Sequence, residues 1–99
     1  MITIGISTWS TEAGNEMGKR SLKLKPTPDF VKMNGPYMYP DEREGIMCIT
    51  IFKYDKSKAG EAAEAIASGY MPFFGVPGFR YALKNASGAT ATMKMMGLG

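Results

Sequence analysis

The most apolar stretch of the chain is IMCITIF, residues 46–52. Its short length and its isoleucines predict a β-strand, because β-branched side chains favour extended backbone. Both alternating sets of side chains are largely apolar, which is typical of a strand that is covered on both faces. We therefore expect this segment to lie at the centre of a sheet.

Three further segments have the pattern of strands. Residues 2–6 read ITIGI, so isoleucines alternate with small or polar residues and give one strongly apolar face. Residues 30–39 and 79–85 each begin with an aromatic residue and also have strand character. Because Pro36 cannot donate a hydrogen bond to a ladder, we expect the strand over residues 30–39 to lie at an edge or to carry a bulge.

Two longer segments have the pattern of helices. Residues 12–25 begin acidic and end basic, which suits the helix dipole, and Pro26 follows as a helix breaker. Residues 55–70 begin with Asp55 as a capping residue. They then carry an apolar stripe at helical spacing, formed by Ala59, Ala62, Ala63, Ile66 and Tyr70. A short helix is expected over residues 89–96, with Leu98 folding back on it after Gly97.

The predicted order of elements is β-α-β-β-α-β, followed by the short C-terminal helix. This order defines an α+β fold of the ferredoxin-like plan, with a four-stranded antiparallel sheet and two helices on one face. Right-handed crossovers place the first and third strands in the centre. At 99 residues, the chain is predicted to form one domain over residues 1–99.

Two helices cover one face of such a sheet, and the other face is predicted to be open. We expect the helices to cover the two aliphatic sets, Ile2/Ile4/Ile6 and Met47/Ile49/Ile51. The open face would then carry Thr3, Gly5, Ser7, Lys32, Asn34, Ile46, Cys48, Thr50, Phe52, Arg80, Ala82 and Lys84. Because an exposed apolar patch at Ile46, Cys48 and Phe52 marks an interface, we expect a homodimer that packs sheet against sheet through this open face.

The order of elements and the stretch Gly75-Val76-Pro77-Gly78-Phe79, which follows an alanine-rich helix, resemble small uncharacterised members of the dimeric α+β barrel superfamily. The resemblance covers nearly the whole chain and implies ferredoxin-like protomers that pair. Members of that superfamily include cofactor-independent monooxygenases, haem-degrading enzymes, isomerases and ligand-binding domains. A shared fold therefore does not fix the function.

Composition excludes several classes of site. The chain has no histidine and one cysteine, which excludes haem ligation by histidine, Cys/His zinc sites and histidine-based triads. We expect no cofactor and no metal. Twelve basic and nine acidic residues give a net charge of +3, which is too small for the strongly basic surface of a typical nucleic-acid binder. The N-terminus lacks the pattern of a signal peptide, no segment is long enough to cross a bilayer, and the single cysteine suits a reducing compartment, so we expect a cytoplasmic protein.

Five residues are candidates for ligand binding: Trp9, Asn34, Tyr37, Cys48 and Arg80. Trp9 and Asn34 are of the types that some cofactor-free oxygenases of the superfamily use to position substrate, and Arg80 suits a carboxylate. Each also has a structural alternative. Trp9 would pack over a helix end, Asn34 would sit in a turn, Cys48 would be a small buried hydrophobe, and Arg80 would form a surface ion pair. No catalytic residue is assigned.

We therefore expect a homodimer that binds a small, partly apolar molecule. A cofactor-independent monooxygenase or isomerase is the alternative, and it requires a cavity in which polar groups such as Asn34 and Arg80 converge. RNA binding is the weaker alternative, because Phe52 is the one aromatic residue on the two central strands that can stack on a base.

Overall fold

A computed structural model describes residues 1–97 of the chain. Within these residues the order of elements is β1 (Ile2–Trp9), η1 (Thr11–Ala13), α1 (Gly14–Ser21), β2 (Val31–Asp41), β3 (Gly45–Tyr54), η2 (Lys56–Lys58), α2 (Ala59–Tyr70), η3 (Met71–Phe73), β4 (Arg80–Ala86) and α3 (Ala89–Met95). The η segments are single turns of 3-10 helix that lead into or out of the α-helices. The chain is thus an α+β protein, as the sequence predicts.

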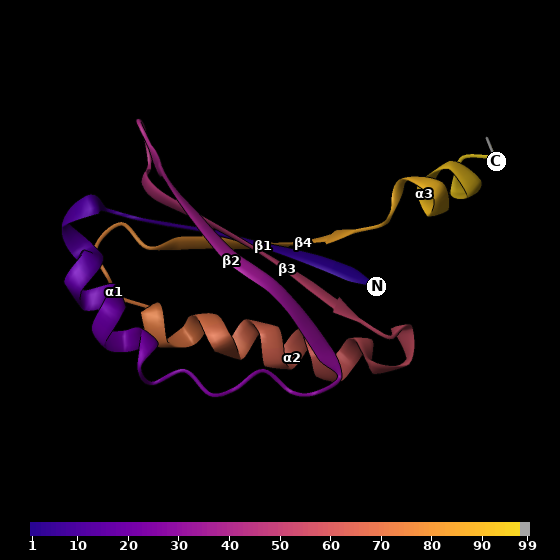
Figure 1. Cartoon of the computed structure of the whole chain (residues 1–99), viewed down its shortest axis with the longest axis horizontal. Coiled ribbons are helices and arrows are strands. Elements are labelled where there is room, and N and C mark those ends of the chain that lie inside the picture. The colour runs from indigo at the N-terminus through magenta and orange to yellow at the C-terminus, as the bar shows by residue number, and fades with distance from the viewer. Residues whose placement is uncertain (98–99) are drawn as a thin grey trace.

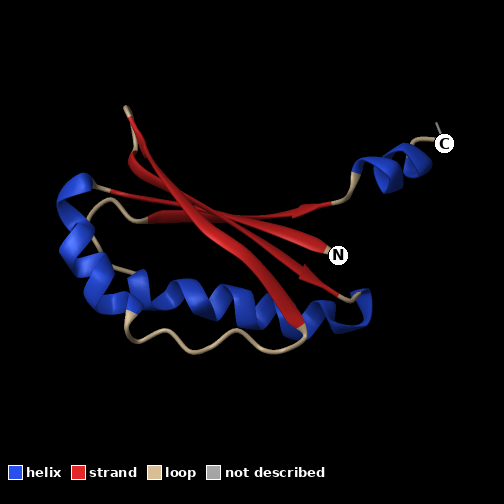
Figure 2. Ribbon diagram, in the orientation of Figure 1, coloured by secondary structure: helices blue, strands red, loops and turns tan. Residues whose placement is uncertain are grey.

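The four strands form one antiparallel sheet in the order β2-β3-β1-β4. The two strands at its centre are β1 and β3, which confirms the prediction from the apolar stretch at residues 46–52. Both α1 and α2 lie on the same side of the sheet, and its other side carries no helix in the described part of the chain (Figure 1, Figure 2). One sheet face is therefore open.

For the two central strands, the prediction of which side chains face the helices is wrong. The buried residues of β1 are Thr3, Gly5, Ser7 and Trp9, and those of β3 are Cys48, Thr50, Phe52 and Tyr54. The isoleucines that alternate with them are only half-buried and lie on the open side. The two sets are exchanged because an alternating pattern defines two faces without saying which one the helices cover. On the edge strands, the residues predicted for the open face do lie there: Lys32, Asn34, Arg80, Ala82 and Lys84.

Large side chains from outside the sheet fill the helix side and require small residues beneath them. Gly5 lies opposite Thr50 in the register, and the hydroxyl of Tyr70 approaches Gly5 so closely that a Cβ there would clash with it. Two hydrophobic clusters complete this layer. The first comprises Trp9, Ala13, Met17, Cys48 and Val76, and the second comprises Val31, Phe52, Tyr54, Ala62 and Ile66.

Strand β2 runs along one edge of the sheet. Its register with β3 shifts between Asn34 and Tyr37, on either side of Gly35-Pro36. The strand therefore has both features that the proline predicts, an edge position and a bulge. Asn34 lies inside this strand at the bulge rather than in a turn.

Helix α1 is shorter than predicted and helix α2 agrees with its pattern. The predicted first helix reaches residue 25, whereas α1 ends at Ser21 and the next residue, Leu22, is exposed. An exposed Leu22 contributes little packing to offset the entropy of extending the helix. In α2, Ala62 and Ile66 are buried as the stripe predicts, but Ala63, which belongs to the same predicted stripe, is exposed because it lies on the side of the helix away from the sheet. The Asp55 carboxylate caps η2, the turn that leads into α2, by accepting a hydrogen bond of 2.9 Å from the Ser57 backbone N–H.

Helix α3 agrees with the predicted tail helix and stands apart from the rest of the chain. It lies beyond the end of β4, displaced from the sheet toward the side opposite α2 (Figure 1). None of its residues is buried. Leu98, which was expected to fold back on this helix, lies outside the described residues.

Replacing Gly5 by alanine should lower the free energy of unfolding by about 1–3 kcal/mol, because the added Cβ overpacks the helix side of the sheet. Besides the Tyr70 hydroxyl, it would lie 3.0 Å from Tyr70 Cζ and 3.1 Å from Phe52 Cε2. The measurement is urea unfolding followed by circular dichroism. Gly18→Ala is the control, since no atom lies within 4 Å of its new Cβ, and it should stabilise α1 by about 1 kcal/mol. An unchanged midpoint for Gly5→Ala would contradict the packing.

Candidate functional site

The five predicted site residues fall on two different faces of the sheet. Trp9 and Cys48 belong to the same buried cluster on the helix side, and only 6% of Trp9 is exposed. Asn34, Tyr37 and Arg80 lie on the open side, as their register with Ile51, Ile49 and Thr8 requires. The structure therefore does not bring the five together, and Trp9 and Cys48 are core residues.

The open face has an aliphatic centre. Cross-strand pairs join Ile4 to Ile51, Ile6 to Ile49 and Thr8 to Met47 on the two central strands. We call the set Ile2, Ile4, Ile6, Met47, Ile49 and Ile51 the aliphatic face. Its members are half-buried by one another, and no helix covers them in the described part of the chain. This is an apolar surface of the kind that marks an interaction site.

One end of the aliphatic face is hollowed into a shallow depression of about 320 Å³. Its lining combines an apolar floor with two opposite charges, and it consists of Ile6, Thr8, Glu44, Met47, Arg80, Tyr81 and Ala82. At the rim, Arg80 Nη2 donates a hydrogen bond of 3.2 Å to Glu44 Oε2. The Arg80 side chain is 78% exposed, so this ion pair is weak and its guanidinium can exchange partners.

Charges divide the open side into two ends. Lys32 and Lys53 are cross-strand neighbours at one end, and Lys84 lies toward the same end on the opposite edge strand β4. At the other end, the turn between β2 and β3 carries Asp41, Glu42 and Glu44 together with Arg43. Asp41 Oδ2 accepts hydrogen bonds of 3.0 and 2.9 Å from the backbone N–H groups of Arg43 and Glu44, which fixes the turn. The open side is therefore basic at one end and mainly acidic at the other.

Asn34 and Tyr37 form a pair of their own at the bulge of β2, where the Tyr37 hydroxyl donates a hydrogen bond to Asn34 Oδ1. Both are exposed. Strands β2 and β4 are opposite edges of the sheet, so Asn34 and Arg80 are separated by at least three strand spacings, about 14 Å. These two polar residues do not converge on one cavity.

The helix side holds a line of buried polar groups between the sheet and α2. Thr3 Oγ1 and the Tyr54 hydroxyl are joined by a buried hydrogen bond of 2.7 Å. Burial raises the pKa of the Cys48 thiol, and hydrogen bonds with Ser7 and Thr50 only partly oppose this. A cysteine with a raised pKa in an apolar cluster is a poor nucleophile, which fits a structural role.

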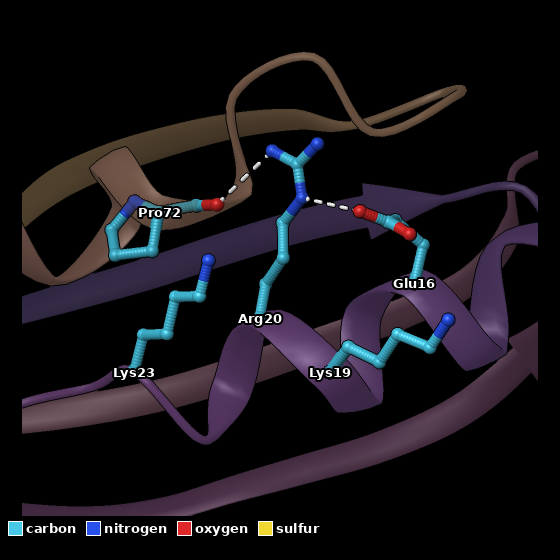
Figure 3. A pocket seen from close by; sticks show the side chains of 5 residues that line it. All are labelled: Glu16, Lys19, Arg20, Lys23 and Pro72. Atoms are coloured by element: carbon cyan, nitrogen blue, oxygen red, sulfur yellow. Dashed lines mark hydrogen bonds and ion pairs between the residues drawn. The ribbon is translucent and has the colours of Figure 1, made fainter.

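A second depression, of about 520 Å³, lies between α1 and η3 and is lined by Glu16, Lys19, Arg20, Lys23 and Pro72 (Figure 3). Arg20 occupies its centre. Arg20 Nε donates to Glu16 Oε1 at 2.8 Å, and Nη1 donates to the carbonyl oxygens of Pro72 at 3.2 Å and Phe74 at 2.5 Å. The hydrogen bond from Arg20 also lowers the pKa of Glu16. Through Nε and Nη1, Arg20 therefore holds α1 against η3 and the backbone that follows it.

Among residues 1–97, no three histidine, cysteine, aspartate or glutamate side chains gather closely enough to hold a metal ion. None of the helices formed by these residues combines the length and hydropathy that spanning a bilayer requires.

Comparisons with known proteins give no match: no protein-family model, no curated protein and no solved structure is significantly similar to this chain.

Sequence reasoning missed that the aliphatic face is the open one. The sequence does contain a signal for the true arrangement, in the residues that alternate onto the same face of each central strand. Trp9 shares its face with Gly5 and Ser7, and a large residue at a strand end beside small residues is the pattern expected beneath packed helices. Tyr54 extends the Cys48 and Thr50 set in the same way.

The stability of the protein should fall as pH rises from about 10 to about 12, because burial raises the pKa of Tyr70 to about 12. The nearby Cys48 adds to this shift. The folded state favours the neutral phenol of Tyr70. The contribution of Tyr70 to the free energy of unfolding is therefore complete below the pKa of about 10 in the unfolded state, and it is lost as pH rises through the pKa in the folded state. Urea unfolding of the wild type and Tyr70→Phe at pH 8, 10 and 11.5 measures it.

The two proteins share every other ionisable group, so the informative quantity is the difference between their stabilities at each pH. The stability of the wild type should decline more steeply than that of Tyr70→Phe. Parallel declines would contradict the burial of the Tyr70 hydroxyl.

Proposed function

We propose that this chain is a ferredoxin-like protomer of a homodimer of the dimeric α+β barrel type, and that the dimer binds a small, partly apolar anion. The observation that carries the proposal is the uncovered aliphatic face with the depression at its Arg80 end. A reducing cytoplasm suits its one cysteine, Cys48, which is a buried free thiol.

A second copy of the chain is the occupant that the open side fits best. Two aliphatic faces packed together would remove the isoleucines of both from water, and burial of such side chains is the main driving force of association. Packing of two sheets face to face is a standard way of forming a core between them.

The charges favour one orientation of the two copies. A two-fold axis in the plane of the interface, perpendicular to the strands, lays the basic end of one copy over the acidic end of the other. Lys32 and Lys53 of one chain then approach Asp41 and Glu42 of its partner. The same symmetry forms this contact twice, and complementary charges of this kind set the register of an interface.

The depression beside Arg80 is the proposed ligand site. In the isolated chain it is open, and in the dimer the second sheet covers it, so the site is complete only when two copies pair. Its floor, which includes Ile6, Met47 and Ala82, suits an apolar body, while Arg80 suits a carboxylate or sulfonate that displaces Glu44.

The two alternative functions gain no support from the geometry. The enzymatic alternative needs convergent polar groups, but Asn34 and Arg80 lie on opposite edges of the sheet. RNA binding relied on Phe52 as a stacking residue, but Phe52 is buried on the helix side.

Sedimentation equilibrium at 1–50 µM should give a mass of twice 10.8 kDa for the wild type. Ile49→Lys, which places a charge at the centre of the aliphatic face, should shift the protein to the monomer, because the buried lysine would have no partner. Ala63→Lys on the exposed surface of α2 is the matched control and should remain a dimer. A wild-type monomer across this range would overturn the proposal.

Paired charge reversals give a second measurement, which does not require the Ile49→Lys variant to fold. Lys53→Glu alone and Glu42→Lys alone should each weaken the dimer, because each places like charges at both ends of the interface. An equimolar mixture of the two variants should recover dimers, since a heterodimer regains opposite charges at both ends. Failure of the mixture to recover dimers would contradict the proposed orientation.

The ligand site can be tested with 8-anilinonaphthalene-1-sulfonate, an aromatic anion whose fluorescence rises in apolar surroundings. Arg80→Gln should weaken its binding by about tenfold, the value of one charge-assisted hydrogen bond. Glu44→Gln should strengthen binding, because it frees the guanidinium of Arg80. Lys19→Gln, in the depression beside α1, is the control and should change nothing. Equal affinities for the wild type and Arg80→Gln would contradict the site.

A further inference from the structure

We infer that α3 of each subunit packs on the β2–β3 hairpin of its partner and closes the dimer at both ends. The inference rests on the proposed dimer and goes beyond it, because it assigns a partner to two apolar surfaces that lie outside the sheet-to-sheet interface. The first is the set of methionines Met93, Met95 and Met96 at α3. The second is the hairpin surface, which consists of Tyr37, Met38, Tyr39 and Pro40.

Within residues 1–97, the methionines at α3 are left exposed by the other elements of the chain. Met93, Met95 and Met96 are 47%, 77% and 66% exposed, and no residue of α3 is buried. A seven-residue helix is too short to be stable in water by itself, so this one needs a surface to pack on. Methionine is the side chain best suited to adapt to such a surface.

The hairpin surface is apolar on both faces of the ribbon. By register, Tyr37 and Tyr39 point to the open side and Met38 to the helix side, and these residues are 57%, 43% and 59% exposed. Met38 remains exposed because this half of β2, an edge strand, reaches beyond the cover of α1 and α2 (Figure 1). The hairpin thus offers apolar side chains that its own chain leaves in contact with water.

The geometry brings the two surfaces together. In Figure 1, the turn of the hairpin and α3 lie toward opposite ends of the longest axis, which measures 47 Å, and α3 is displaced toward the open side of the sheet. Because α3 follows β4 and the hairpin residues lie on β2, the two surfaces are also at opposite edges of the sheet. A two-fold axis in the interface plane that is perpendicular to the line from the hairpin to α3 exchanges both the ends and the edges. Relative to an axis perpendicular to the strands, it is tilted within that plane. Each α3 then lies at the hairpin of the partner subunit, on the side from which that subunit covers the sheet.

The test uses full-length variants mixed in pairs. Met95→Cys and Met38→Cys, purified separately under reduction, are combined and oxidised, and linked dimers are counted on a non-reducing gel. We expect efficient crosslinking of this pair and little for Met95→Cys with Lys19→Cys, because Lys19 lies on α1 away from the open face. The native Cys48 is buried and serves in every sample as an internal control.

The dimer dissociation constant gives a second readout. Replacing Met93, Met95 and Met96 together by glutamine should raise it by about tenfold, since apolar contacts are lost at both ends. The matched triple replacement by leucine should leave it nearly unchanged. A dimer with an unaltered dissociation constant and no Met95–Met38 crosslink would overturn the role of α3 while leaving the sheet-to-sheet dimer intact. A wild-type monomer would instead overturn the proposed function and, with it, this inference.

Discussion

The contact between the Tyr70 hydroxyl and Gly5 determines how the two layers of this protein fit together. Tyr70 is the last residue of α2, and it reaches a point on the central strand β1 where no side chain stands in its way. The neighbouring positions on the helix side, Ser7 and Thr50, are also small. The large groups of this layer come from the helices and from the ends of the strands. As a consequence, Ile2, Ile4, Ile6, Ile49 and Ile51 of the central strands are left for the other side of the sheet.

This arrangement explains why the positions of the strands and helices can be predicted from the sequence, whereas the sheet face that the helices cover cannot. Strand and helix positions follow from local patterns, so IMCITIF, the capped segment after Asp55 and the bulge at Gly35-Pro36 are all found as expected. The choice of face does not follow from any local pattern, because Ile4 and Gly5 define the two sides of β1 equally well. It depends on Tyr70, which is 65 residues from Gly5 along the chain and whose position is set only by the complete fold.

The same reversal changes the meaning of the candidate site. Trp9 and Cys48 are candidates by their chemistry, but both belong to the core, where burial raises the pKa of the Cys48 thiol. Arg80 keeps its predicted position on the open side, since the register of β4 with β1 fixes it there. The depression itself was not predictable, because it is formed by side chains of Ile6, Met47 and Arg80 from three different strands.

The hydrogen bonds of Arg20 carry a consequence for the order of folding. They join α1 to the carbonyl groups of Pro72 and Phe74, which are 52 and 54 residues away in sequence. By contrast, β2 and β3 pair across a turn of a few residues. Closing a loop over a long segment costs more entropy than closing a short one. The β2–β3 hairpin can therefore form early, whereas the Arg20 contacts form only after the connection between α2 and β4 has packed against α1. Loss of the Arg20 contacts would therefore speed unfolding more than it slows folding.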